Sequence, residues 1–162
     1  MSKIPLVLRE LHRSETSLAR ALLAAADRHR AEHEVFHVAR DIAGWSRDHV
    51  RQLAEAGRSH GLRLAAEPRT APLPPVAALS RRLSTSLGRR PEPGLLLLAD
   101  LRRLHLKAAG LSVDWELLAQ VAQGTKQRPL LELAQRCHPE TLRQLRWANA
   151  QIKSHAPQVL AS

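Results

Sequence analysis

The first residues whose types and spacing could bind a metal are Glu34 and His37, three positions apart. On a helix this spacing brings a carboxylate and an imidazole close together, and such a pair can bind iron or manganese. Ile42 is a predicted core position of the same helix, so it serves as the reference for the direction of the pair. At about 100° per residue, His37 lies roughly 140° from Ile42, and Glu34 lies on the flank. We therefore expect this pair to point away from the core.

Glu15 and His49 are the charged or titratable residues that the helical spacing turns inward. Glu15 lies at the centre of an otherwise apolar stripe, and its predicted level in the neighbouring helix is that of Ser46 and His49. A buried carboxylate is costly without a partner, so we expect Glu15 and His49 to form a hydrogen bond or ion pair, with Ser46 or Thr141 nearby. The alternative is a single-metal site on Glu15 and His49, with Cys137 as a further ligand.

Two further residues have packing or interface interpretations. Cys137 is predicted to be a small buried residue and no nucleophile, because the adjacent His138 points at a different angle. Trp147 lies about 120° off its apolar stripe, which predicts a contact with the segment 62–93 or with a second copy of the chain. The sequence contains no glycine-rich phosphate loop, no Gly-x-Ser-x-Gly motif and no zinc spacing, so we expect no catalytic residue.

Length and composition favour a single all-α domain over residues 1–162. Hydrophobic residues make up 44% of the chain but aromatic residues only 2%, so the core must be built from leucine, alanine and valine. Leucine and alanine are strong helix formers. The N-terminus lacks a signal-peptide pattern, and no apolar segment reaches the roughly 18–20 residues of a membrane span. We therefore expect a cytoplasmic protein that does not enter a membrane.

The chain has a formal net charge of +10, and its densest basic group lies in the segment 62–93. This group consists of Arg81, Arg82, Arg89 and Arg90. These arginines are either solvated or form a strap that contacts anions. A basic surface raises the affinity for phosphates, so association with nucleic acid is an alternative prediction, although no recognised nucleic-acid motif accompanies the charge.

Four apolar stripes with three- and four-residue spacing predict helices over about 4–30, 33–60, 95–125 and 128–154. The first stripe consists of Ile4, Leu8, Leu11, Glu15, Leu18, Leu22 and Ala26. Ser112 and Asp114 leave a second possibility for the third helix, because either could cap a new helix there. The proline-rich segment 62–93 is predicted to be a long crossover between the second and third helices.

The predicted order is two antiparallel helices, a long crossover and two further antiparallel helices, and it resembles the ferritin-like superfamily of four-helix bundles. This resemblance implies a di-iron site with one Glu from each of two helices and a Glu-x-x-His pair from each of the other two. The sequence departs from that pattern. The second helix offers Ser46 and His49, and the inward mid-level positions of the fourth are Cys137 and Thr141. Glu140 is predicted to point elsewhere.

The incomplete ligand set predicts a non-catalytic bundle that acts as a cytoplasmic binding or assembly module. We expect a homo-oligomer, most simply a dimer, with a further protein partner possible and no cofactor. The alternative prediction is a divergent metal-binding oxidase or iron-handling protein, in which Glu15 and His49 would bind iron or manganese. The second alternative is the basic protein associated with nucleic acid.

Overall fold

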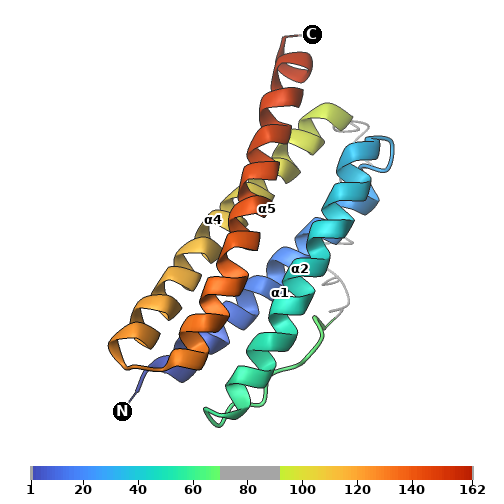
Figure 1. Ribbon diagram of the computed structural model, residues 1–162. Helices are drawn as coiled ribbons and strands as arrows, with labels where there is room; N and C mark the ends of the chain where they lie inside the picture. Colours follow the sequence, from blue (N-terminus) through green and yellow to red (C-terminus); the bar gives the residue numbers. More distant parts are fainter. Residues whose placement is uncertain (1, 70–91, 162) are drawn as a thin grey trace.

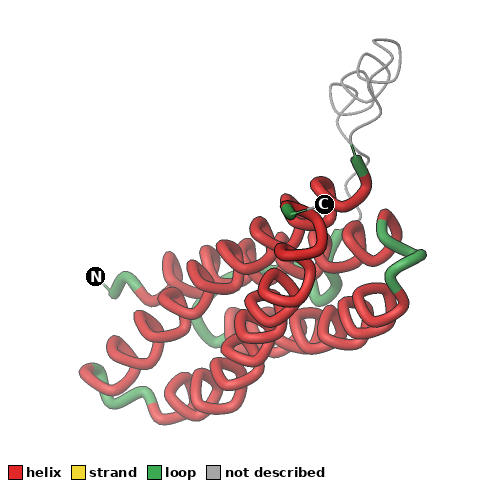
Figure 2. The backbone as a smooth tube through the Cα atoms, turned by 90° about the horizontal axis from the view of Figure 1, so that it is seen from above, coloured by secondary structure: helices red, strands yellow, loops and turns green. Residues whose placement is uncertain are grey.

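All regular structure that the computed structural model describes is helical (Figures 1 and 2). The model describes residues 2–69 and 92–161. Within these ranges the helices are α1 (Ile4–Arg28), α2 (His33–Arg58), α4 (Pro93–Gly124) and α5 (Arg128–Leu160). The prediction of an all-α chain with four long helices is therefore confirmed. The four arginines predicted to form a basic strap, Arg81, Arg82, Arg89 and Arg90, lie outside the described residues.

The apolar stripes explain why these segments fold as packed helices. All seven residues of the first stripe are buried in α1, including Glu15. In α2 the stripe is completed by small residues, and Ala39, Ala43 and Ala54 are buried beside the predicted core positions. Alanine combines a high helix propensity with a small volume, so the backbones of α1 and α2 can approach closely.

The helices end where the sequence supplies turn-forming residues. Gly61 has a φ of +73°, and the N–H of Leu62 donates to the carbonyl of Gly57 over 2.9 Å. A residue without a Cβ adopts this left-handed conformation at low cost, so the chain turns sharply after α2. α4, in contrast, continues without a break through Ser112 and Asp114. The alternative of a new helix beginning there is wrong.

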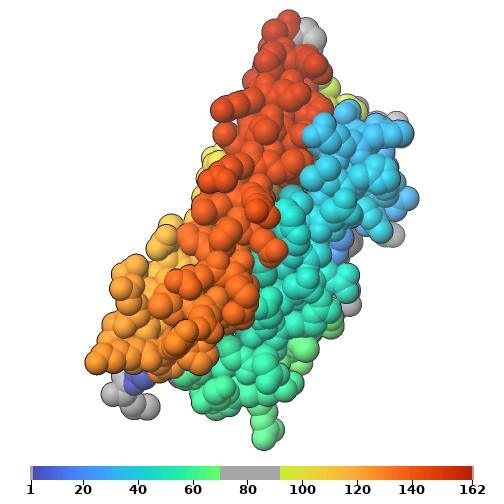
Figure 3. All heavy atoms as spheres, in the orientation of Figure 1, coloured from blue at the N-terminus to red at the C-terminus, as the bar shows by residue number. Residues whose placement is uncertain are grey.

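The helices form a ring of neighbours in which α1 packs against α2 and α4, and α5 packs against α4 and α2. Figure 3 shows the face on which α5 and α2 lie side by side. Hydrogen bonds fix the register between α1 and α4: Ser14 pairs with Asp114, and Arg28 pairs with Asp100. The residue number in α4 thus falls as the number in α1 rises.

One large apolar cluster fills the bundle, and a smaller cluster of Val35, Leu97 and Leu101 lies beside it. The indole of Trp147 packs against both clusters and is half-buried. No helix in the described part of the chain is long and apolar enough to cross a membrane.

The first part of the predicted crossover returns along α1. Leu62 is buried in the main cluster, and Leu64 packs against it. The Nε2 atom of His12 in α1 lies 2.7 Å from the carbonyl oxygen of Ala65, so the segment 62–69 is attached to the outer side of that helix. Together with α4, this segment and α1 enclose a surface groove.

Candidate functional site

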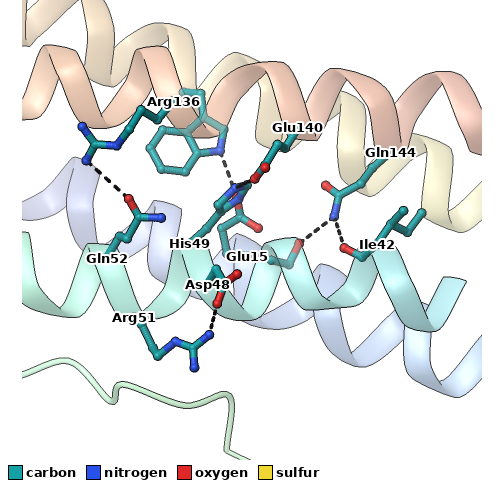
Figure 4. A network of polar contacts seen from close by, with 11 residues as sticks. Glu15, Ile42, Asp48, His49, Arg51, Gln52, Arg136, Glu140 and Gln144 are labelled. Atoms are coloured by element: carbon teal, nitrogen blue, oxygen red, sulfur yellow. Dashed lines mark hydrogen bonds and ion pairs between the residues drawn. The ribbon is translucent and has the colours of Figure 1, made fainter. Parts of the chain in front are cut away.

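A chain of polar side chains crosses the centre of the bundle, and each helix contributes one residue to it. These residues are Glu15 from α1, His49 from α2, Trp115 from α4 and Glu140 from α5 (Figure 4). The side chains of Glu15 and His49 are fully buried, whereas that of Glu140 is 34% exposed. The site is therefore closed on the α1 side and reaches solvent beside α5.

His49 is held between two carboxylates. Its Nδ1 lies 2.7 Å from Oε1 of Glu15, and its Nε2 lies 2.7 Å from Oε2 of Glu140. An ionised carboxylate can only accept hydrogen bonds, so both ring nitrogens of His49 must donate. The geometry therefore requires a positively charged imidazolium with a negative partner on each side.

The electrostatics of His49 agree with this protonation state. Burial by itself disfavours the charged ring and lowers its pKa. Hydrogen bonding with the side chains of Cys137 and Glu15, together with their charge interactions, raises the pKa more strongly. The net result moves the pKa of His49 from 6.5 to about 10. The ring is therefore charged at neutral pH, although it is enclosed in the bundle.

Glu15 is the second fully buried member of the site. Its Oε1 accepts hydrogen bonds from Nδ1 of His49 and, over 2.9 Å, from Nε1 of Trp115. Its Oε2 is also buried but has no hydrogen-bond partner among the described residues. A buried carboxylate is tolerated when a cation and further donors compensate its desolvation, and His49 and Trp115 provide that compensation.

A second polar layer lies one turn away, toward the first turn of α2. The side-chain amide of Gln144 donates to the carbonyl of Ile42 over 2.8 Å and to Oγ of Ser46 over 3.0 Å. The Oγ1 of Thr141 and the Oε1 of Gln144 are buried without a partner. Ser46 and Thr141 are therefore close in level to Glu15, as predicted, but neither hydrogen-bonds to it.

The structure confirms the predicted contact between Glu15 and His49 and corrects the prediction for Glu140. Glu140 was expected to point away from the site, because its Cα lies on the flank of the α5 stripe. Its side chain has three rotatable bonds and reaches from the flank to Nε2 of His49. The donor role of Trp115 was missed by the sequence analysis, because helical periodicity gives no partner for the indole N–H, which donates to Glu15.

The Glu34–His37 pair does not belong to the central site, whereas Cys137 lies beside His49. Glu34 and His37 are exposed, and Glu34 accepts a hydrogen bond from Gln151 instead of facing His37. Cys137 is buried with a free thiol, as predicted. Trp147 packs against the core of its own chain, and its Nε1 is buried without a partner. Its predicted role in an interface stays a prediction.

A second ionic cluster, near the turn between α1 and α2, was missed by the sequence analysis. Asp100 of α4 is buried, with only 6% of its surface exposed. It accepts from Nε2 of His29 over 2.8 Å and from the guanidinium of Arg28. His29 belongs to the turn after α1, where helical periodicity gives no direction, so the sequence held no signal for this contact.

Within residues 2–69 and 92–161, no group of three or more His, Cys, Asp or Glu side chains is arranged so that it could hold a metal ion. At the central site, the ring of His49 lies between the carboxylates of Glu15 and Glu140. No protein-family model matches the sequence, and no curated protein or solved structure is significantly similar to it.

Proposed function

We propose that the chain is a non-catalytic, ferritin-like helical bundle that acts as a binding or assembly module in the cytoplasm. The observation that carries this proposal is the position of His49, whose two ring nitrogens each lie 2.7 Å from a carboxylate oxygen. A general base or a metal ligand needs a free nitrogen lone pair. His49 has none while both carboxylates remain in place, so it stabilises the core and is not positioned for chemistry.

The register of the inward positions supports the ferritin-like part of the proposal. α2 presents Ser46 and His49 three residues apart, and α5 presents Thr141 and Gln144 three residues apart, with Ser46 and Gln144 in contact. Both pairs have the spacing of the Glu-x-x-His motif of di-iron bundles. Three of these four positions hold a neutral side chain that is a poor ligand for iron. We infer an antiparallel bundle that retains the spacing of a metal centre without its charge.

The register between neighbouring helices supports the antiparallel arrangement. Between α2 and α5, Glu34 pairs with Gln151, and Gln52 pairs with Arg136. The residue number in α5 falls as the number in α2 rises, as it does between α1 and α4. This order of directions fits a bundle in which two antiparallel pairs are joined by one long crossover.

Metal analysis of the purified protein tests the proposal. After incubation with Fe(II), Mn(II) or Zn(II) and removal of free metal, we expect less than about a tenth of an equivalent of any metal, because a true site fills nearly stoichiometrically. The His49→Gln variant is the control and should retain the same background amount. Near-stoichiometric binding that disappears in this variant would show that the proposal is wrong.

The alternative function is a single iron or manganese site at Glu15 and His49. One observation favours it: Oε2 of Glu15 is buried without a partner, and Glu140 and Cys137 lie beside the same histidine. Binding would require His49 to lose a proton and to release one carboxylate. The same metal analysis decides between the two functions, and Glu140→Gln should increase metal loading if the ion pair competes with the metal.

Assembly into a homodimer is the second part of the proposed function. One stripe of the outer surface of α4 is apolar, and it lies beside the exposed Arg102 and Arg103. Leu106, Val113 and Leu117 are 52%, 58% and 56% exposed, and their spacing of seven and four residues places them on one face. A helix with two apolar faces needs a second partner, and a second copy of α4 presents a matching surface.

A further inference from the structure

The groove between α1, α4 and the segment 62–69 is lined by seven cationic side chains among the described residues. It has a volume of about 1080 Å³. Its cations come from three separate elements: Arg9, Arg13 and Arg20 from α1, Arg63 and Arg69 from the segment, and Arg103 and Lys107 from α4. We call it the α1–α4 groove.

Most of this positive charge is not neutralised by the protein. Among the described residues, no acidic side chain lies within ion-pair distance of Arg9, Arg20, Arg63 or Arg69. The only acidic residue among the described lining residues is Glu67, which lies 3.4 Å from Arg47 and 3.5 Å from Arg51 of α2. The groove therefore has an excess of cations that a ligand can neutralise.

Two residues that line the groove each have one buried polar atom without a hydrogen-bond partner among the described residues. The Nε of Arg20 and the Oγ1 of Thr16 are both buried and unpaired, and both residues line the groove. Buried donors in native proteins almost always have an acceptor. An anion bound beside α1 would supply one, and phosphate oxygens accept hydrogen bonds from guanidinium and hydroxyl groups in this way.

The cations form a line rather than a single cluster. Arg9, Arg13, Thr16 and Arg20 follow one face of α1 at intervals of four, three and four residues. At 1.5 Å per residue this face extends about 16 Å. Across the groove, Nζ of Lys107 lies 2.7 Å from Oγ of Ser17, which holds α4 and α1 together along its length. A line of charges fits a linear polyanion better than one phosphate.

We propose that the α1–α4 groove binds the phosphodiester backbone of single-stranded nucleic acid. This inference rests on the proposed binding function and names its partner. Pockets for drug-sized ligands measure about 300–1,000 Å³, so this groove holds a few nucleotides of one strand. The described lining residues include no Phe, Tyr or Trp on which a base could stack. Recognition therefore uses phosphates, and RNA and DNA strands of any sequence bind.

Fluorescence anisotropy with labelled oligo-dT and oligo-U of about twelve nucleotides tests the proposal. The groove variant combines Arg9→Gln with Arg63→Gln, two exposed residues without ion pairs. The matched control combines Arg143→Gln with Arg146→Gln, which are exposed on α5 and remove the same charge. Circular dichroism checks that both variants are folded.

We expect the wild type to bind both strands at low salt, with a log–log salt dependence. Each lost phosphate contact should reduce the slope by about 0.7, so the groove variant should lose about 1.4 of the slope and at least about tenfold in affinity. The control should change the affinity less than about twofold.

The proposal would be overturned by no binding of the wild type at low salt, by equal losses in the two variants, or by a duplex that binds as tightly as the single strand. Displacement by inorganic phosphate at a matched phosphate concentration would also overturn it, because it would indicate a site for one phosphate. None of these results affects the metal analysis. The proposal of a non-catalytic bundle is therefore tested separately from the proposal of nucleic-acid binding.

Discussion

At the scale of single residues, the central feature is an imidazolium with two carboxylate partners. Removing one partner leaves a charge buried without compensation, whereas removing both charges leaves an apolar core. The network formed by Glu15, His49 and Glu140 is therefore expected to show strong energetic coupling. This coupling distinguishes an ion pair inside the core from two residues that only lie near each other.

A double-mutant cycle measures the coupling. Glu15→Leu alone should reduce the free energy of unfolding by about 3–5 kcal/mol, because it leaves His49 charged and facing one carboxylate. Combining it with His49→Leu should cost clearly less than the sum of the two single changes. Urea unfolding of the four proteins provides the measurement. Additive losses would show that the two residues do not interact.

The raised pKa of His49 makes the stability depend on pH. The folded ring holds its proton with a pKa of about 10, whereas the unfolded ring has a pKa near 6.5. The folded state therefore binds more protons between these values. The stabilisation is fully present below pH 6.5 and is lost as the pH rises through about 10.

Unfolding measured at several pH values between 6.5 and 10 should show a falling free energy in the wild type and a flatter profile in His49→Gln. The comparison with this variant removes contributions from other groups that titrate in the same range. Parallel profiles in the two proteins would contradict the assigned charge of His49.

The sequence predicted two of the three charged members of this network. Glu15 and His49 lie on apolar stripes, so helical periodicity gives their direction directly. Glu140 lies beside its stripe, and its direction depends on side-chain torsions that periodicity does not encode. The donor role of Trp115 depends on the packing of α4 against α1, which is equally absent from the sequence pattern.

At the scale of elements, α4 differs from the other helices. Its inner face contributes Leu104, Ala108 and Leu111 to the core, while Leu106 and Val113 on its outer face are more than half exposed. These exposed apolar side chains form one stripe of α4, beside the exposed Arg102 and Arg103. An amphipathic helix buries its apolar face against one partner, whereas α4 has further apolar side chains that its own bundle leaves exposed.

The proposed dimer predicts that charge on the outer face of α4 separates the two copies. Leu106→Lys with Val113→Lys should convert a dimer to a monomer, because each buried leucine or valine contributes about 1.5–3 kcal/mol to association. Light scattering after size-exclusion chromatography measures the mass. The control is Leu6→Lys with Leu160→Lys, which are also exposed but lie near the chain ends. A monomeric wild type would contradict the dimer.

Helix positions were predictable because each stripe spans several turns. The predicted limits of 4–30 and 33–60 differ from α1 and α2 by two residues or fewer. α5 continues to Leu160, beyond the predicted end at 154. The prediction ended too early because the last turns of α5 lack a strong apolar stripe. The path of residues 62–69 was not predictable, since the contact between His12 and the backbone of Ala65 follows no periodic rule.

At the scale of the whole molecule, seven cationic side chains from three distant parts of the chain meet in the α1–α4 groove. The sequence analysis assigned the anion contact to the arginines of the crossover, because these are adjacent in sequence. Those arginines lie outside the described residues, so their predicted anion contact stays a prediction. The α1–α4 groove combines residues from positions 9 to 107, and only the fold brings positions so far apart in the sequence together.

α1 belongs to both sites, with Glu15 facing the core and Arg9, Arg13 and Arg20 facing the groove. The same turns of α1 carry both faces. Insertion of a single residue near Leu11 would rotate everything after it by about 100° without changing the helix propensity. Arginines would then enter the core and leucines would line the groove. Point substitutions in α1 should therefore be tolerated far more often than changes in its length.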